Sequence, residues 1–128
     1  MQYYFSRIIK GSFEDTMNRA IEELKKEGFG VLTEIDVKAT MKKKLDVDFK
    51  KYHILGACNP PFAYKALQAE DKIGTMLPCN VIIIEVDADT TEVAAINPLV
   101  SMQAVNNPGL NDVAQTITGK LKKVVESI

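Results

Sequence analysis

The sequence contains no tryptophan, a single histidine and only two cysteines in 128 residues. Two cysteines do not make a disulfide scaffold in a chain of this size, so both are expected as free thiols in a reducing cytosol. A Ser-His-Asp triad would have to use His53, the single histidine. The G-x-G-x-x-G, G-x-x-x-x-G-K-[ST] and G-x-S-x-G motifs are also absent. Standard dinucleotide, P-loop and serine-hydrolase signatures are therefore excluded.

Long apolar runs and an excess of positive charge are missing as well. The apolar run at residues 81–84 falls far short of the roughly 20 residues that a membrane-spanning helix needs. No charged leader followed by an apolar stretch begins the chain, so no signal peptide is expected. The formal net charge is −1. We therefore expect a cytoplasmic protein that binds neither nucleic acid nor membrane.

One local cluster of positive charge departs from this balance. It consists of Lys42, Lys43 and Lys44 and continues with Lys50 and Lys51. Such a run could touch phosphate, but a short charge run is more often a solvated face. Without an overall basic face, it does not change the expectation about nucleic acid.

The chain does have an ordinary globular composition, with 46% apolar and 26% charged residues. Its length is close to the commonest size of one domain, so residues 1–128 are expected to form a single α+β domain. Periodicity predicts the element order β-α-β-β-α-β-β-α. Strands are expected at residues 3–9, 31–42, 52–57, 80–86 and 92–96, and helices at 13–27, from 60 to about 74, and 110–128.

The clearest alternation lies at residues 31–42, where Val31, Thr33 and Ile35 are expected to share one face of a strand. Alternation of this kind is typical of antiparallel sheets with one face on the core and one facing water. The predicted fold is therefore a mainly antiparallel sheet packed by helices. A buried stripe along residues 110–128 is expected to lay the last helix on the sheet or on a partner.

Two Cys-Asn pairs, Cys58-Asn59 and Cys79-Asn80, are the best candidates for a site. Asn59 precedes Pro60 and Pro61, a strong start signal for a helix, with Asn59 as the N-cap. Free N–H groups at such a helix end favour an anion, so Cys58 is the thiol expected to be reactive. The structural alternative is that both cysteines are small apolar fillers and that each Asn satisfies nearby backbone.

Metal and hydrolase chemistry are less well supported. The cysteines stand 21 residues apart without a C-x-x-C, and two thiolates fill only half of a tetrahedral zinc shell, so no metal and no cofactor are predicted. Strand alternation places His53 and Cys58 on opposite faces, which argues against a Cys-His nucleophile pair. Glu85 falls in a buried-looking strand, where it needs a partner or an edge that reaches solvent.

The stretches I-L-G-A-C-N-P-P-F-A at residues 54–63 and L-P-C-N-V at 77–81, with Asn97-Pro98, resemble the domain-of-unknown-function 302 family. The resemblance extends over essentially the whole chain. It implies a compact antiparallel sheet with helices packed on it, similar to the TATA-binding-protein-like class, and a homodimer. It implies no established activity.

Three functions remain open. The first is a homodimeric binding module that holds a small, anionic or sulfur-containing ligand near Cys58, Asn59, Cys79 and Asn80. The second is a thiol-dependent or redox enzyme, with Cys58 as nucleophile and Cys79 as the resolving thiol. The third is a structural or interaction protein without a ligand. Whether the protein is an enzyme stays undecided at this level.

Overall fold

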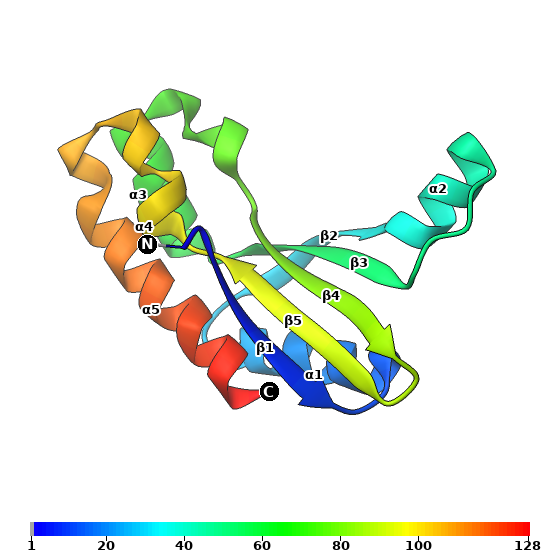
Figure 1. The fold of residues 1–128 in the computed structure, drawn as a ribbon. Coiled ribbons are helices and arrows are strands. Elements are labelled where there is room, and N and C mark those ends of the chain that lie inside the picture. Colours follow the sequence, from blue (N-terminus) through cyan, green and yellow to red (C-terminus); the bar gives the residue numbers. More distant parts are fainter. Residues whose placement is uncertain (1) are drawn as a thin grey trace.

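The computed structural model describes residues 2–128 and contains a five-stranded sheet in the order β1-β5-β4-β3-β2, with every neighbouring pair antiparallel (Figure 1). The strands are β1 (Tyr4–Lys10), β2 (Gly30–Asp36), β3 (Tyr52–Cys58), β4 (Cys79–Asp87) and β5 (Thr90–Ile96). The helices are α1 (Phe13–Lys26), α2 (Val37–Leu45), α3 (Pro60–Ala69), α4 (Pro98–Ser101) and α5 (Asn111–Ser127). Three short 3-10 helices, η1 (Asp71–Met76), η2 (Gln103–Val105) and η3 (Pro108–Leu110), complete the chain. The predicted α+β class is confirmed, with α2 and α4 as additions.

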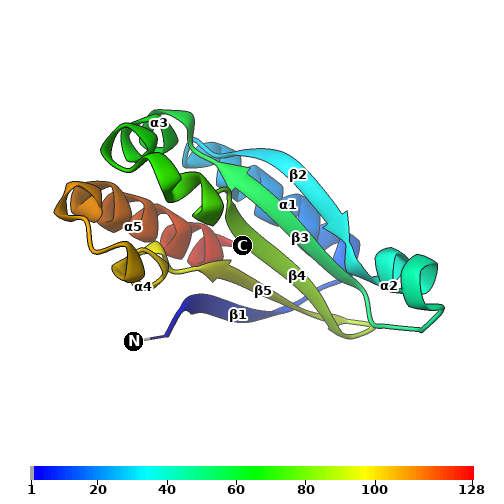
Figure 2. The same ribbon diagram turned by 90° about the horizontal axis from the view of Figure 1, so that it is seen from above.

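Helices cover one face of the sheet, which we call the core face. α1 contacts β2, β4 and β5, and α5 contacts β1, β5 and α1 (Figure 2). Residues paired directly across antiparallel strands share a face. Leu55 pairs with Val81 and Val81 with Ala95, and all three are buried beneath the helices.

The opposite face, which we call the open face, carries no helix within residues 2–128. It is formed by the residues that alternate with the core-face positions, namely Tyr4, Ser6, Ile8, Lys10, Thr33, Ile35, Tyr52, Ile54, Gly56, Asn80, Ile82, Ile84, Thr90, Glu92, Ala94 and Ile96. Most of these side chains are apolar, so the open face differs from the polar outer face of an ordinary two-layer domain.

The two long helices begin and end as predicted from local signals. Ser12 Oγ accepts a hydrogen bond of 3.1 Å from the backbone N–H of Asp15, which caps α1. Gly28, with φ of +87°, follows its end. Every apolar position of the stripe predicted for the last helix is buried: Leu110, Val113, Ala114, Ile117, Leu121, Val124, Val125 and Ile128. Arg7 ties this helix to β1 by donating to the carbonyl oxygens of Glu126 and Ile128, both at 2.8 Å.

The predicted strand at residues 31–42 is wrong beyond Asp36, where α2 begins instead. Asp36 caps that helix, since its carboxylate accepts a hydrogen bond of 2.9 Å from the N–H of Ala39. The predicted face is wrong as well, because a bulge shifts the register between Val31 and Thr33. Val31 therefore pairs on the core face, whereas Thr33 lies on the open face. A bulge of this kind reverses the side-chain alternation after it.

Residues 37–51, which we call the arm, extend beyond the sheet at the end opposite to α3 and α4 (Figures 1 and 2). None of the α2 residues is buried, and the helix contacts mainly β2 and β3, from which it emerges. At the other end of the molecule, the helix predicted to reach Gly74 stops at Ala69 and continues as η1. No helix within residues 2–128 combines the length and the apolar character that a membrane span requires.

Candidate functional site

A cavity of about 330 Å³ lies between the end of the sheet, α3, η1 and α5; we call it the cysteine cavity. Its walls are Phe29, Leu32, Ala57, Cys58, Asn59, Phe62, Ala63, Ala66, Leu67, Gly74, Leu77, Pro78, Cys79, Met102, Val113 and Ile117. None of these residues carries a charge. The cavity is therefore an apolar space with sulfur atoms of three residues in its lining.

The sheet register brings the two cysteines together at this cavity. Ala57 of β3 pairs with Cys79 at the start of β4, and Cys58 is the next residue of β3. Cys79 is 8% exposed, whereas Cys58 is half-buried. Both are free thiols. Residues 21 positions apart in the sequence thus share one apolar site, as the binding hypothesis requires.

Cys79 is a weak candidate for thiolate chemistry. Burial raises the pKa of its thiol from 9.0 to about 11, and a negative charge on Cys58 would add to this rise. Because the thiolate, not the thiol, is the nucleophile, Cys79 stays protonated and inert at neutral pH. It contributes a small, polarisable wall to the cavity.

The helix start beside Cys58 does not provide the free N–H groups that the sequence suggested. Pro60 and Pro61 occupy the first two positions of α3 and have no backbone N–H. The N–H of Phe62, the third position, donates to the carbonyl oxygen of Asn59 at 3.1 Å. A thiolate at Cys58 therefore has no unpaired donor from the first turn of α3, and the expected anion site is not formed.

Asn59 has the N-cap position that was predicted, but its side chain makes no cap hydrogen bond. Because Pro60 and Pro61 follow Asn59, the first turn of α3 has few backbone N–H groups that a cap could satisfy. The amide Nδ2 instead donates to the carbonyl oxygen of Glu27 at 3.0 Å, across from the end of α1. Asn59 is 7% exposed, so this bond fixes one wall of the cysteine cavity in place.

Asn80 does not join the other three predicted residues. It pairs with Gly56 on the open face and lines a hollow of about 290 Å³ there, together with Tyr4, Ile82 and Glu92. Successive residues of a strand point to opposite faces, so Cys79 and Asn80 cannot both face the cysteine cavity. Of the four predicted residues, Cys58, Asn59 and Cys79 line the cysteine cavity and Asn80 does not. Cys79 and Asn80 both line a separate hollow of about 280 Å³ beside Pro78 and Met102.

His53 and Glu85 have structural partners elsewhere. The His53 ring lies 5.7 Å from that of Phe13, between β3 and α1, and does not line the cysteine cavity. Glu85 Oε1 accepts a hydrogen bond of 3.3 Å from the N–H of Lys51. Within residues 2–128, no group of three or more His, Cys, Asp or Glu residues is placed to hold a metal ion.

The apolar wall is the part of the site that sequence reasoning missed. Phe62 comes from α3, Leu77 follows η1, Met102 follows α4, and Val113 and Ile117 come from α5. The helical stripe at residues 110–128 identified the last two as buried, but nothing in their spacing shows that they face a cavity rather than packed core.

A protein of known crystal structure has a similar fold. The crystal structure of an uncharacterized conserved protein DUF302 from Bacillus stearothermophilus is similar to this chain, with 27% sequence identity and a TM-score of 0.91. The match covers 99% of this chain and 98% of that chain. None of the curated proteins compared with the chain matches it. The family model described as "Domain of unknown function DUF302" matches residues 5–128. The chain therefore belongs to the DUF302 family, a family of unknown function.

Proposed function

We propose that the protein is a binding module that holds a small, uncharged, largely apolar molecule in the cysteine cavity. The observation that carries this proposal is the cavity itself. Its volume of about 330 Å³ lies within the range of small-ligand pockets, roughly 300–1,000 Å³. Leu32 and Leu67, two of its walls, expose 67% and 43% of their surface, so the space is open for a ligand to enter.

The lining determines the class of ligand. An ionised ligand would lose its hydration without gaining a counter-charge, because none of the lining side chains is charged. The first turn of α3 also supplies no free N–H groups, so the anionic ligand expected from the sequence is not supported. Cys58, Cys79 and Met102 add polarisable sulfur atoms, which make favourable contacts with aromatic rings. A neutral molecule with an aromatic or aliphatic body fits this lining best.

A thiol-dependent or redox function is the second candidate, because both cysteines line the same cavity. In that function the two thiols would form one S–S bond and pass two electrons and two protons to a disulfide or peroxide oxidant. The high pKa of Cys79 weakens this candidate, since a resolving thiol must ionise to attack.

A binding module with two free thiols is best suited to the cytoplasm, where free thiols persist.

The binding proposal is tested by titrating the protein with N-phenyl-1-naphthylamine, a neutral dye that fluoresces in apolar surroundings. Ala63→Trp places a large ring in the wall of the cavity, and Ala69→Trp places the same ring on an exposed position of the same helix. We expect saturable binding to the wild type and to Ala69→Trp, and at least tenfold weaker binding to Ala63→Trp. Equal binding by all three proteins would contradict the proposal, and no binding by any would favour a structural role.

Thiol labelling separates the two candidate functions. Iodoacetamide should modify Cys58 alone in the folded protein, and saturating dye should slow this reaction because it occupies the same cavity. Treatment with diamide, a thiol oxidant, should leave both thiols reduced in the presence of dye. Rapid formation of an intramolecular disulfide, seen as the loss of two hydrogens in the intact mass and absent from Cys58→Ser, would support the redox function instead.

A further inference from the structure

The open face carries a hollow of about 290 Å³, which we call the open-face hollow; it shares no lining residue with the cysteine cavity. Ala94 of β5 lies at its floor and is 5% exposed, although no helix of residues 2–128 covers this face. The next open-face residues along β5, Glu92 and Ile96, are longer than Ala94 and line the hollow on either side of it. A short side chain between two long ones therefore creates the hollow at a fixed place in the sheet.

One carboxylate lies at one end of this hollow, which otherwise has an uncharged lining. Glu92 is half-buried and pairs with Ile8 on β1 and Ile84 on β4, so apolar side chains flank it on both sides. Within residues 2–128 it makes no ion pair, not even with Lys10, one open-face position further along the sheet. A carboxylate that loses part of its hydration among apolar groups requires a counter-charge. Glu92 is therefore the lining residue that selects the charge of a ligand.

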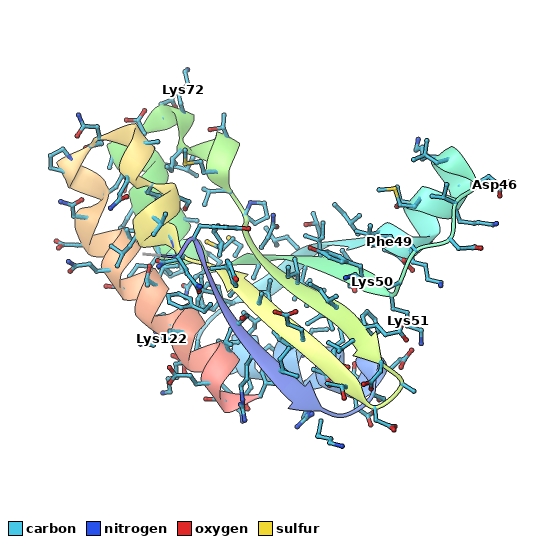
Figure 3. The ribbon with its side chains drawn as sticks, in the orientation of Figure 1. Asp46, Phe49, Lys50, Lys51, Lys72 and Lys122 are labelled. Carbon is cyan, nitrogen blue, oxygen red and sulfur yellow. The ribbon has the colours of Figure 1, made fainter. Side chains whose placement is uncertain are left out.

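Positive charge lies elsewhere in the molecule. Of the lysines labelled in Figure 3, Lys50 and Lys51 belong to the arm, Lys72 to η1 and Lys122 to α5. The residues that line the open-face hollow include neither lysine nor arginine. The lining does not supply a counter-charge for Glu92, so the counter-charge is left to a ligand.

Two tyrosines line the other end of the hollow. Tyr4 pairs with Ile96, which is four residues from Glu92 along β5, so the two ends lie about 13 Å apart. The Tyr3 and Tyr4 rings meet edge to face, with their centroids 4.9 Å apart, and Tyr3 exposes 64% of its surface. Aromatic rings attract a further ring in this kind of arrangement. Asn80 also lines the hollow and offers both a donor and an acceptor to a polar group of a ligand.

We infer that the open-face hollow is a second binding site, which takes a small arylalkylamine, that is, an aromatic ring joined to a primary ammonium group by a short carbon chain. The ammonium group pairs with the Glu92 carboxylate, the carbon chain lies over Ala94, and the ring meets the ring of Tyr4. Ile82 and Ile84 of β4 bury one side of the chain. The site is independent of the one proposed for the cysteine cavity, since the two have no lining residue in common.

Other classes of ligand fit this lining less well. An anion would face the Glu92 carboxylate without a positive group beside it. A metal ion needs several ligating side chains, and no group of three or more His, Cys, Asp or Glu residues within residues 2–128 is placed to hold one. A neutral apolar molecule would cover Glu92 without giving it a counter-charge. An organic cation satisfies both the carboxylate and the apolar floor.

A pair of probes of the same shape tests the inferred charge selection. Phenethylamine carries the ammonium group, and phenethyl alcohol replaces it with a neutral hydroxyl. In nitrogen–proton correlation NMR spectra, phenethylamine should shift the amide signals of Tyr4, Glu92 and Ala94 saturably. We expect the alcohol to bind more weakly by about tenfold or more, because a hydrogen bond to a charged group is worth more than one between neutral groups. Equal binding of the two probes, or no binding of phenethylamine, would overturn the inference.

Variants locate the amine. Glu92→Gln keeps the shape of the side chain and removes its charge, so it should weaken phenethylamine binding by about tenfold or more and leave that of the alcohol unchanged. Glu34→Gln makes the same change on β2, outside the hollow, and is the matched control, which should bind as the wild type does. Unchanged phenethylamine binding by Glu92→Gln would overturn the inference, as would an equal loss in Glu34→Gln.

Two further variants separate this site from the cysteine cavity. Ala94→Leu fills the floor of the open-face hollow and should abolish phenethylamine binding, with a circular dichroism melt to check that the variant folds. Ala63→Trp fills the cysteine cavity and should leave phenethylamine binding unchanged. Loss of phenethylamine binding in Ala63→Trp would overturn the second site, whereas failure of the neutral dye to bind would contradict the proposed function alone.

Discussion

The side-chain amide of Asn59 donates a hydrogen bond of 3.0 Å to the main-chain carbonyl oxygen of Glu27, and this bond joins the start of α3 to the end of α1. Gly28 lies directly against the amide, since a Cβ at Gly28 would be 3.2 Å from Asn59 Nδ2. The start of α3, which borders the cysteine cavity, is thus held to the end of α1 by one buried donor.

Removal of this donor should destabilise the fold. Asn59→Ala leaves the Glu27 carbonyl without its side-chain partner and should lower the free energy of unfolding by about 1–3 kcal/mol. Asn59→Asp should lower it further, because it places a buried carboxylate against a carbonyl oxygen. Urea denaturation measures both changes. Asn18→Ala, at an exposed position of α1, should stay within about 0.5 kcal/mol of the wild type; an equal loss there would show that the Asn59 bond is not the cause.

Stability at high pH should depend on Cys79. Its pKa is about 11 in the folded state and 9.0 when the group is fully solvated, so between these values the folded state binds more protons than the unfolded state. Stability is therefore fully present below pH 9 and falls as the pH rises toward 11, by at most about 2–3 kcal/mol. Urea unfolding of the wild type and Cys79→Ala at several pH values measures this, because other titrating groups cancel in the difference. A difference independent of pH would contradict the assigned burial.

Close packing at Gly56 should make that position intolerant of a side chain. A Cβ there would overlap the Thr33 side chain and lie 2.8 Å from Pro78 Cγ. Gly56→Ala should therefore destabilise the protein by about 1–3 kcal/mol. Gly119→Ala is the control, because a Cβ in α5 meets no atom within 4 Å and should add about 0.5–1 kcal/mol of stability. Thermal melts of both variants measure these opposite shifts, and a shift of the same sign in both would refute the packing argument.

Two buried threonines should respond in opposite directions to the same substitution. Thr16 Oγ1 of α1 is buried with no hydrogen-bond partner within residues 2–128. Thr118 Oγ1 of α5 accepts from the N–H of Leu99 at 3.2 Å and donates to Asn97 Oδ1 at 3.4 Å. Thr16→Val should raise the free energy of unfolding by about 1 kcal/mol, whereas Thr118→Val should lower it by about 1–3 kcal/mol. Denaturant titration of the two variants measures both changes in the free energy of unfolding. A loss of stability in Thr16→Val would show that the Thr16 hydroxyl has a hydrogen-bond partner in solution.

Local signals in the sequence were sufficient for most elements. Ser12 and Gly28 delimit α1 because capping depends on residues within one turn. The stripe of the last helix is correct at every predicted apolar position because a period of 3.6 is a property of the helix itself. The α2 helix was missed because its sequence lacks such a helical period. Its residues alternate in polarity like a strand, and only the Asp36 cap, with no buried stripe behind it, indicates a helix.

The geometry of the candidate site could be predicted only in part. Three of the four residues of the Cys-Asn pairs, Cys58, Asn59 and Cys79, line one cavity. Their individual roles could not be predicted, because each depends on a contact with a distant segment. Asn59 bonds to Glu27, and Asn80 turns to the open face.

By itself the sequence determined the α+β class, the limits of the long helices and the positions of the two Cys-Asn pairs, because these follow from periodicity, caps and the prolines that break elements. Only the tertiary structure decided which residues meet. The register between β3 and β4 pairs Ala57 with Cys79 and so brings Cys58, the next residue, to the same cavity. The bulge after Val31 turns Thr33 and Ile35 to the open face. Strand register and bulges depend on pairing between segments far apart in the chain, and no local pattern encodes that pairing.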